Sequence, residues 1–268
     1  MVFIWRYSVM ILASHGLIAS LQGGFDADYQ GILTYATTQG YTLPSAGQQI
    51  LQNQLVLDLK TGGIWTKLDT FAVFATDGNS DFALIDWKRL SQFTAVNSPT
   101  FTTNVGFSGN STSAYVNTNF NPSTSGVNYT LNNASRIMYG DFPSDSGYPE
   151  SAAGGLDNLT RSSNNNTRQR INQGSSNVLA GPANWTGNNI FKSLNRTSLT
   201  NIEMFGNLTQ TSTTATSTSI SNNNQWLLAG NSAFSTSANI FKIYGMGASL
   251  VSENTDLYNA LNTYITSL

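Results

Sequence analysis

Apolar residues recur at helical spacing near the start of the chain. Tyr29, Leu33 and Ala36 follow Asp26, whose carboxylate is suited to accept hydrogen bonds from the free amides of a first helical turn. Gly40 suits the left-handed residue that follows a helix end. The pattern therefore predicts a helix between Asp26 and Gly40.

A second helix follows directly. Pro44 and Ser45 open it, residues 50, 51, 55 and 59 are apolar and share one face, and Gly62 and Gly63 end it. We expect residues 25–69 to form a helical region.

The pattern changes at Thr70. Residues 70–76 are rich in β-forming side chains, and residues 82–87 form a second apolar run. The turn-rich residues 77–81 lie between them. This pattern fits either a hairpin or a strand, a loop and a helix.

From Ser91 onward the chain alternates short β-forming runs with Gly, Asn, Ser and Pro turns, a pattern typical of a mainly β sandwich or barrel. The Thr/Ser tract 209–219 predicts a polar strand and its loop. The expected strands are 100–103, 114–119, 136–140, 168–172, 189–194, 201–208, 225–229 and 239–246. Helical spacing returns in residues 253–268, so a short helix should cover one edge or end of a sandwich spanning 70–268.

Charge is scarce in this chain. Only 10% of its 268 residues are charged and the net charge is −2, against about 25% charged residues in ordinary soluble domains. No basic stripe marks a nucleic-acid partner. Polar Asn, Ser and Thr side chains dominate, as on secreted and virion proteins. The chain has no cysteine, which excludes disulfides and thiolate metal sites.

Residues 1–24 are predicted to be an apolar attachment or oligomerisation segment. The apolar run around residues 9–12 is far short of the ~20 residues that span a bilayer, so we expect no stable transmembrane span. A docking segment that builds a homo-oligomer, with a trimer favoured, is the preferred interpretation. A signal peptide and a membrane contact are the alternatives.

Seven short motifs, taken in order, resemble a group of phage and marine-metagenome virion structural proteins. These have a concanavalin-like or laminin-G-like jelly roll and occur in tail fibres, spikes or related structures. The motifs cover about half of the chain, and residues 136–240 are only generically similar. The resemblance implies a jelly-roll (concanavalin A-like) sandwich at a virion surface, with other virion proteins as partners; no site residue carries over. The motifs are residues 35–44, 65–71, 81–87, 97–101, 106–110, 115–120 and 257–264.

Catalytic groups are few. His15 is the only histidine and lies in the apolar N-terminal segment, which argues against a Ser–His–Asp triad and against zinc. Glycoside hydrolysis needs two paired carboxylates, yet Glu203 stands alone on its predicted strand. We therefore predict a protein that is not an enzyme and needs no cofactor.

Asp77, Asn79 and Asp81 place oxygen atoms at alternate positions, as calcium loops do. The loop departs from the EF-hand pattern, because Phe82 stands where glycine is required and Lys88 where glutamate is. These three residues form a candidate Ca²⁺ site, and a plain turn is the alternative.

Sugar binding needs aromatic faces beside polar donors. Phe142 and Tyr148 lie in the loop 141–150, Trp185 and Asn188 lie in the loop 181–189, and Arg168 flanks an Asn-rich stretch. These five residues are the candidate ligand site. The alternative places Trp185 in packing over the sandwich edge.

The residues and the resemblance together predict a bacteriophage spike, fibre or decoration protein. Its lectin-like module would attach to a receptor or glycan on the host cell. The alternatives are a purely architectural virion protein and a secreted bacterial adhesin or appendage subunit.

Overall fold

A computed structural model describes residues 24–143, 150–152, 158–161, 167–168, 170–173, 185–230, 234 and 238–268. His15, Tyr148 and the predicted segment 1–24, except its last residue, lie outside this part of the chain.

Both predicted N-terminal helices are confirmed, α2 (Ala27–Gln39) and α3 (Ala46–Thr61). Asp26 caps α2 by accepting a hydrogen bond from the Asp28 backbone N–H, and Gly40 follows the helix with φ 76°. Ser45 caps α3 by accepting from the Gln48 N–H at 3.3 Å.

The junction after α3 is the strand, loop and helix that the sequence allowed, and not a hairpin between residues 70–76 and 82–87. A 3-10 turn (Trp65–Lys67) leads into β1 (Leu68–Val73), and α4 (Ser80–Ala83) follows the 77–79 loop. A small hairpin comes next, made of β2 (Ile85–Asp86) and β3 (Ser91–Gln92).

An eight-stranded antiparallel sheet forms the centre of the molecule, in the order β14-β13-β12-β8-β16-β6-β5, with β1 also paired to β16. The Thr/Ser tract supplies β14, as predicted. The other strands are β5 (Thr100–Thr102), β6 (Gly106–Ser108), β8 (Ala134–Phe142), β12 (Gly187–Arg196), β13 (Asn201–Gly206), β14 (Thr209–Thr214) and β16 (Ile240–Gly247).

A six-stranded sheet packs beneath it, in the order β11-β10-β9-β15-β7-β4. A short helix, α5 (Pro122–Ser125), follows β7 in the chain. The strands are β4 (Thr94–Val96), β7 (Tyr115–Asn117), β9 (Glu150–Ala152), β10 (Asn158–Arg161), β11 (Thr167–Arg168) and β15 (Gln225–Leu227).

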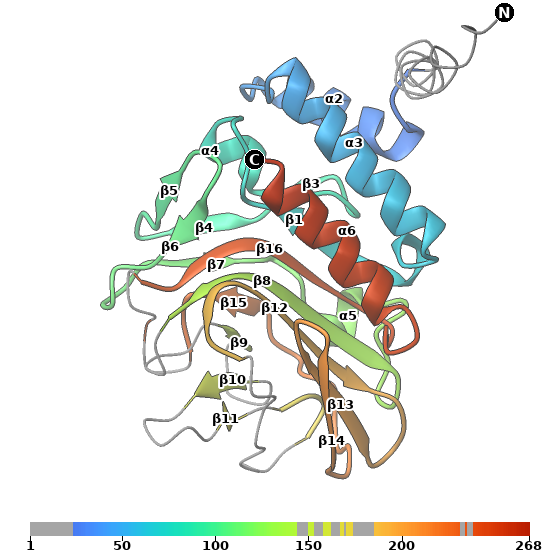
Figure 1. Cartoon of the computed structure of the whole chain (residues 1–268). Coiled ribbons are helices and arrows are strands. Elements are labelled where there is room, and N and C mark those ends of the chain that lie inside the picture. The colour runs from blue at the N-terminus through green and yellow to red at the C-terminus, as the bar shows by residue number, and fades with distance from the viewer. Residues whose placement is uncertain are drawn as a thin grey trace, which may run out of the picture.

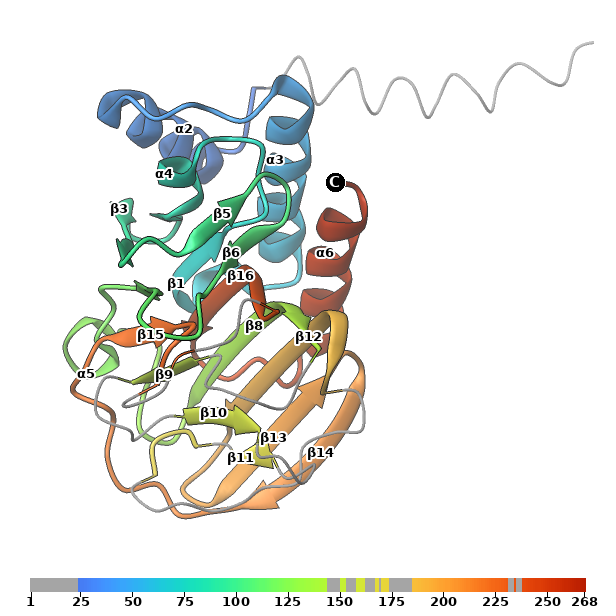
Figure 2. The same cartoon turned by 90° about the vertical axis from the view of Figure 1, so that its left-hand side faces the viewer.

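The central strands of the large sheet are buried on both faces. Successive side chains of a strand point to opposite faces, so Ile137 and Tyr139 of β8 pack with the helices while Met138 packs between the sheets. Leu55 of α3 and Leu261 of α6 (Asn254–Thr266) belong to the helix-side core. Figures 1 and 2 show α2, α3 and α6 on one side of the large sheet and β9, β10 and β11 on the other.

The predicted C-terminal helix exists, but its position differs from the expectation. It lies across a face of the large sheet beside α3 rather than over an edge or end (Figure 1). The cause is its apolar stripe, because Leu257, Leu261 and Ile265 are buried in the core that the helical region shares with the sheet.

The predicted fold class is confirmed: the chain is a mainly β, jelly-roll-type sandwich with an N-terminal helical segment and a C-terminal helix. Across the residues with described coordinates, no helix is both long and apolar enough to cross a membrane.

Candidate functional site

The structure buries the two aromatic rings of the predicted ligand site that it describes. Phe142 is 2% exposed and Trp185 is 4% exposed. The ammonium group of Lys192 lies 4.1 Å from the centre of the Phe142 ring and 5.2 Å from that of Trp185. Both rings thus belong to the core between the sheets, so neither offers a face to a sugar.

The other described residues of that predicted site lie elsewhere. Asn188 is exposed at the start of β12, where its neighbour Asn189 donates its backbone N–H to Asp141 Oδ1 at 2.8 Å. Asp141 also pairs with Lys242 at 2.9 Å. Arg168 belongs to β11 of the small sheet. The predicted set therefore does not form one described surface.

The oxygens of the candidate calcium loop have other partners. Asp77 Oδ1 accepts the Ser45 N–H at 3.0 Å, and Asn79 Oδ1 caps α4 by accepting the Phe82 N–H at 3.0 Å. Asp81 Oδ1 accepts from the side chain of Gln92. Among the described residues, no three His, Asp or Glu side chains gather as metal ligands would. The geometry is that of a capping turn.

Glu203 lies on β13 and binds its own strand and the next one. Asn201 Nδ2 donates to Oε1 at 2.8 Å, and Oε2 accepts from Gln210 Nε2 at 2.9 Å and from the Ser212 hydroxyl. Burial raises the pKa of Glu203, but the hydrogen bonds from Ser212, Asn201 and Gln210 outweigh it and lower that pKa. This pattern fits strand pairing at the edge of the sheet.

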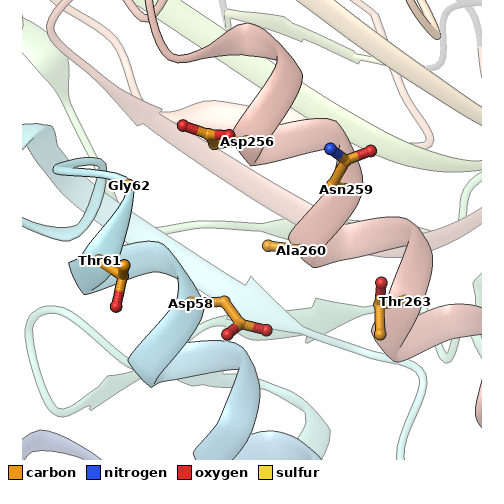
Figure 3. A pocket seen from close by; sticks show the side chains of 7 residues that line it. All are labelled: Asp58, Thr61, Gly62, Asp256, Asn259, Ala260 and Thr263. Atoms are coloured by element: carbon orange, nitrogen blue, oxygen red, sulfur yellow. The ribbon is translucent and has the colours of Figure 1, made fainter.

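A hollow of about 270 Å³ opens between α3 and α6 (Figure 3). Asp58 and Asp256 lie on opposite sides of it, together with Asn259 and Thr263. Its volume is just below the range of roughly 300–1,000 Å³ that is typical of ligand pockets. The lining is mostly polar and lacks aromatic rings, so it is not the preferred candidate site.

The outer face of the small sheet carries a more informative cluster. In β7, Val116 is buried between the sheets, which turns Tyr115 and Asn117 outward. In β15, Leu227 is buried in the same core, which turns Trp226 outward. Strand alternation thus places a tyrosine and a tryptophan on a partly exposed face.

These two rings are in contact. The ring centroids of Tyr115 and Trp226 are 4.6 Å apart and their planes are inclined by 38°. Phe234 extends the cluster, with its centroid 6.3 Å from that of Tyr115. All three side chains are partly exposed. We call these three residues the aromatic cluster.

Unused hydrogen-bond donors lie on the rings and beside them. The strand register places Asn117 between Trp226 on β15 and Thr94 on β4. Within the described part of the chain, the Tyr115 hydroxyl, the Trp226 Nε1–H and the Asn117 Nδ2 group make no hydrogen bond. Exposed rings with free donors beside them form a surface suited to a polyhydroxylated ligand.

Sequence reasoning missed this site although a signal was present. Residues 114–119 and 225–229 were both predicted as strands, but their alternation was not used to separate the inner from the outer face. A tryptophan at a position that alternates with core residues is the informative feature. Spacing alone does not reveal that Tyr115 lies beside Trp226, because 110 residues lie between these two residues in the sequence.

No protein-family model and no curated protein matched the sequence. Solved structures did match. The receptor binding domain of botulinum neurotoxin C/D mosaic serotype has a TM-score of 0.52 at 10% identity, over 74% of this chain and 52% of that one. The binding domain of botulinum neurotoxin serotype D has a TM-score of 0.50 at 13% identity, over 75% and 52%.

A third match is domain 4 of an extracellular arabinanase from Geobacillus stearothermophilus, solved in complex with arabinotriose, with a TM-score of 0.48 at 13% identity, over 72% of this chain and 98% of that one. This chain spans about half the length of the two toxin domains. At such identities the comparison shows the fold alone: the chain has a β-sandwich fold in common with the toxin binding domains.

Proposed function

We propose that this protein is a structural protein of a bacteriophage virion surface, in a spike, fibre or decoration, and that its sandwich attaches to a glycan on the host cell. The aromatic cluster with its free donors carries the proposal. Sugars present apolar C–H faces beside hydroxyl groups, and partly exposed rings flanked by amides match both.

Two further features support this proposal. The chain resembles virion structural proteins in the seven motifs described above, and its low charge fits a surface made of neutral polar groups. A solved structure with this fold is a receptor binding domain of botulinum neurotoxin. The proposal includes a non-enzymatic protein, a homo-oligomer built through residues 1–24 with a trimer favoured, and an extracellular location on the particle.

Competition for phage adsorption tests the attachment role. Purified chain added to host cells should slow adsorption of the phage that carries this protein. The Trp226→Ala variant should not slow adsorption. Tyr35→Ala is the matched control, since Tyr35 is a partly exposed ring paired with Tyr41 on the helical layer, away from the small sheet. Purified chain that leaves adsorption unchanged would contradict the proposal.

A purely architectural virion protein is the second candidate. Its supporting observation is the same exposed aromatic cluster, since contacting subunits also bury aromatic side chains. A map of the assembled particle separates the two functions. An outward-facing Trp226 supports attachment, and a Trp226 covered by a neighbouring subunit supports architecture.

A further inference from the structure

We infer that the aromatic cluster selects neutral glycans over acidic ones. This inference rests on the proposed function and adds the ligand class. Its basis is the chemistry of the described residues beside the three rings: Asn117 and Thr94 are uncharged and polar.

The first step concerns the rings. Trp226 and Tyr115 are tilted by 38° with centroids 4.6 Å apart, and Phe234 is tilted by 38° to Tyr115. Three contacting rings present more apolar surface than a single pyranose face covers. The surface therefore suits an oligosaccharide whose sugars turn C–H groups toward the protein.

The second step concerns the donors. The row Trp226–Asn117–Thr94 crosses three strands, and side chains directly opposite each other on neighbouring strands are about 5 Å apart. Asn117 Oδ1 already accepts the Asn119 N–H at 3.0 Å, which leaves its amide N–H groups to point at a ligand. Sugar hydroxyl groups accept such hydrogen bonds without carrying a charge.

An acidic sugar needs a cation on the protein, because its carboxylate loses water when it binds. Arg89, beside the end of β7, is already committed: its guanidinium donates to Asp86 Oδ2 at 2.5 Å and to the carbonyl oxygens of Thr118 and Asn119. In the described part of the chain, no cation–π contact or ion pair involves the aromatic cluster.

The arginines on the strands of this sheet are distant from Trp226 along the sheet. Arg161 and Arg168 belong to β10 and β11, which are two and three strands away from β15. At the usual strand spacing these backbones are roughly 10 and 15 Å from β15. The described side chains around the rings therefore supply apolar faces and neutral donors, and the strand partners Val96, Thr94 and Ser151 of the outward-facing residues are uncharged.

An array of paired oligosaccharides tests the inference. Each pair has the same glucose- or galactose-based backbone, once neutral and once carrying a uronic or sialic acid. The full chain should bind neutral members at least tenfold more tightly than their acidic partners. Trp226→Ala should weaken this binding by roughly tenfold or more, Trp226→Phe should weaken it less, and Tyr35→Ala should leave it unchanged. Asn117→Lys should narrow the difference between the pairs by strengthening the acidic members.

The outcomes separate this inference from the proposed function. The chain could bind acidic members as tightly as neutral ones, or more tightly, with Trp226→Ala weakening that binding. This result would overturn the neutral preference but still support glycan attachment. Two results would overturn both the neutral preference and glycan attachment. One is that the chain binds no member of the array. The other is that Trp226→Ala keeps the wild-type circular dichroism spectrum and binds as tightly as the wild type.

Discussion

Gln52 lies at the centre of a buried polar network that joins the helices to the large sheet. It is fully buried on α3, and its Oε1 accepts from the Tyr29 hydroxyl of α2 at 2.8 Å. Its Nε2 donates to Thr76 Oγ1, just beyond β1, at 3.1 Å and to Tyr264 Oη of α6 at 3.2 Å. We expect the Gln52–Tyr29 pair to stabilise the fold as a unit.

Gln52→Met keeps the side-chain volume and leaves the buried Tyr29 hydroxyl without its acceptor. Thr76 and Tyr264 each keep another hydrogen bond, so losing their bonds to Gln52 adds little to the destabilisation. One unsatisfied buried group costs about 1–3 kcal/mol, so we expect the variant to lose about 2 kcal/mol. Tyr29→Phe leaves Gln52 Oε1 unsatisfied and should cost a similar amount. The double variant removes both polar groups, so it should lose about 2 kcal/mol instead of about 4.

Urea unfolding of the wild type, both single variants and the double variant measures this coupling. The free energies of unfolding should deviate from additivity by about 2 kcal/mol, with an unchanged dependence on urea concentration. Tyr35→Phe combined with Gln52→Met is the matched control and should be additive, because the Tyr35 hydroxyl makes no hydrogen bond within the described residues. Losses for Tyr29→Phe and Gln52→Met that add within about 0.5 kcal/mol would show that the two residues do not stabilise the fold as a unit.

Three further predictions concern charge, metal and backbone. The low pKa of Glu203 means that its carboxylate contributes stability that is fully present above its ordinary pKa of 4.5 and is lost as the pH falls below that value. Wild type and Glu203→Gln should therefore differ in free energy of unfolding at pH 7, and the difference should shrink as the pH falls below 4.5; a difference independent of pH would contradict this prediction. Millimolar calcium should leave the melting temperature unchanged, because Asp77 already accepts a backbone hydrogen bond, and a rise that disappears in Asp77→Ala would show a calcium site. Gly40→Ala should cost about 1–2 kcal/mol in free energy of unfolding, from its left-handed backbone alone. In Gly106→Ala the added Cβ would meet the Phe241 carbonyl oxygen at 2.0 Å, so this variant should be much less stable in the same urea titration. Equal losses in the two variants would contradict the steric argument.

Local signals in the sequence predicted much of the fold. Asp26, Gly40 and Ser45 mark helix ends through groups that act within one or two turns, so the sequence alone located them. The position of α6 depended on long-range packing. All but one of the nine residues of β8 are buried because the sheet is covered on both sides, and such a strand does not reveal which face meets the helices.

The site was harder to predict for a related reason. Phe142 and Trp185 have polar neighbours in the sequence, which suggested exposed loops, but the structure packs both rings around Lys192 from β12. Tyr115 and Trp226 gave the opposite signal, since their strands look like ordinary parts of a sandwich. Only the pairing of β7 with β15 brings these two rings together.

Isothermal titration of the full chain with purified host surface polysaccharide is the most direct test of glycan attachment through the aromatic cluster. We expect saturable binding that Trp226→Ala weakens by roughly tenfold or more. The variant loses a stacking contact of on the order of 1 kcal/mol and also the apolar area that the ring buries, and a factor of ten corresponds to about 1.4 kcal/mol. Tyr35→Ala should bind like the wild type. Equal affinity of the wild type and a folded Trp226→Ala variant would contradict the claim that the aromatic cluster is the attachment site.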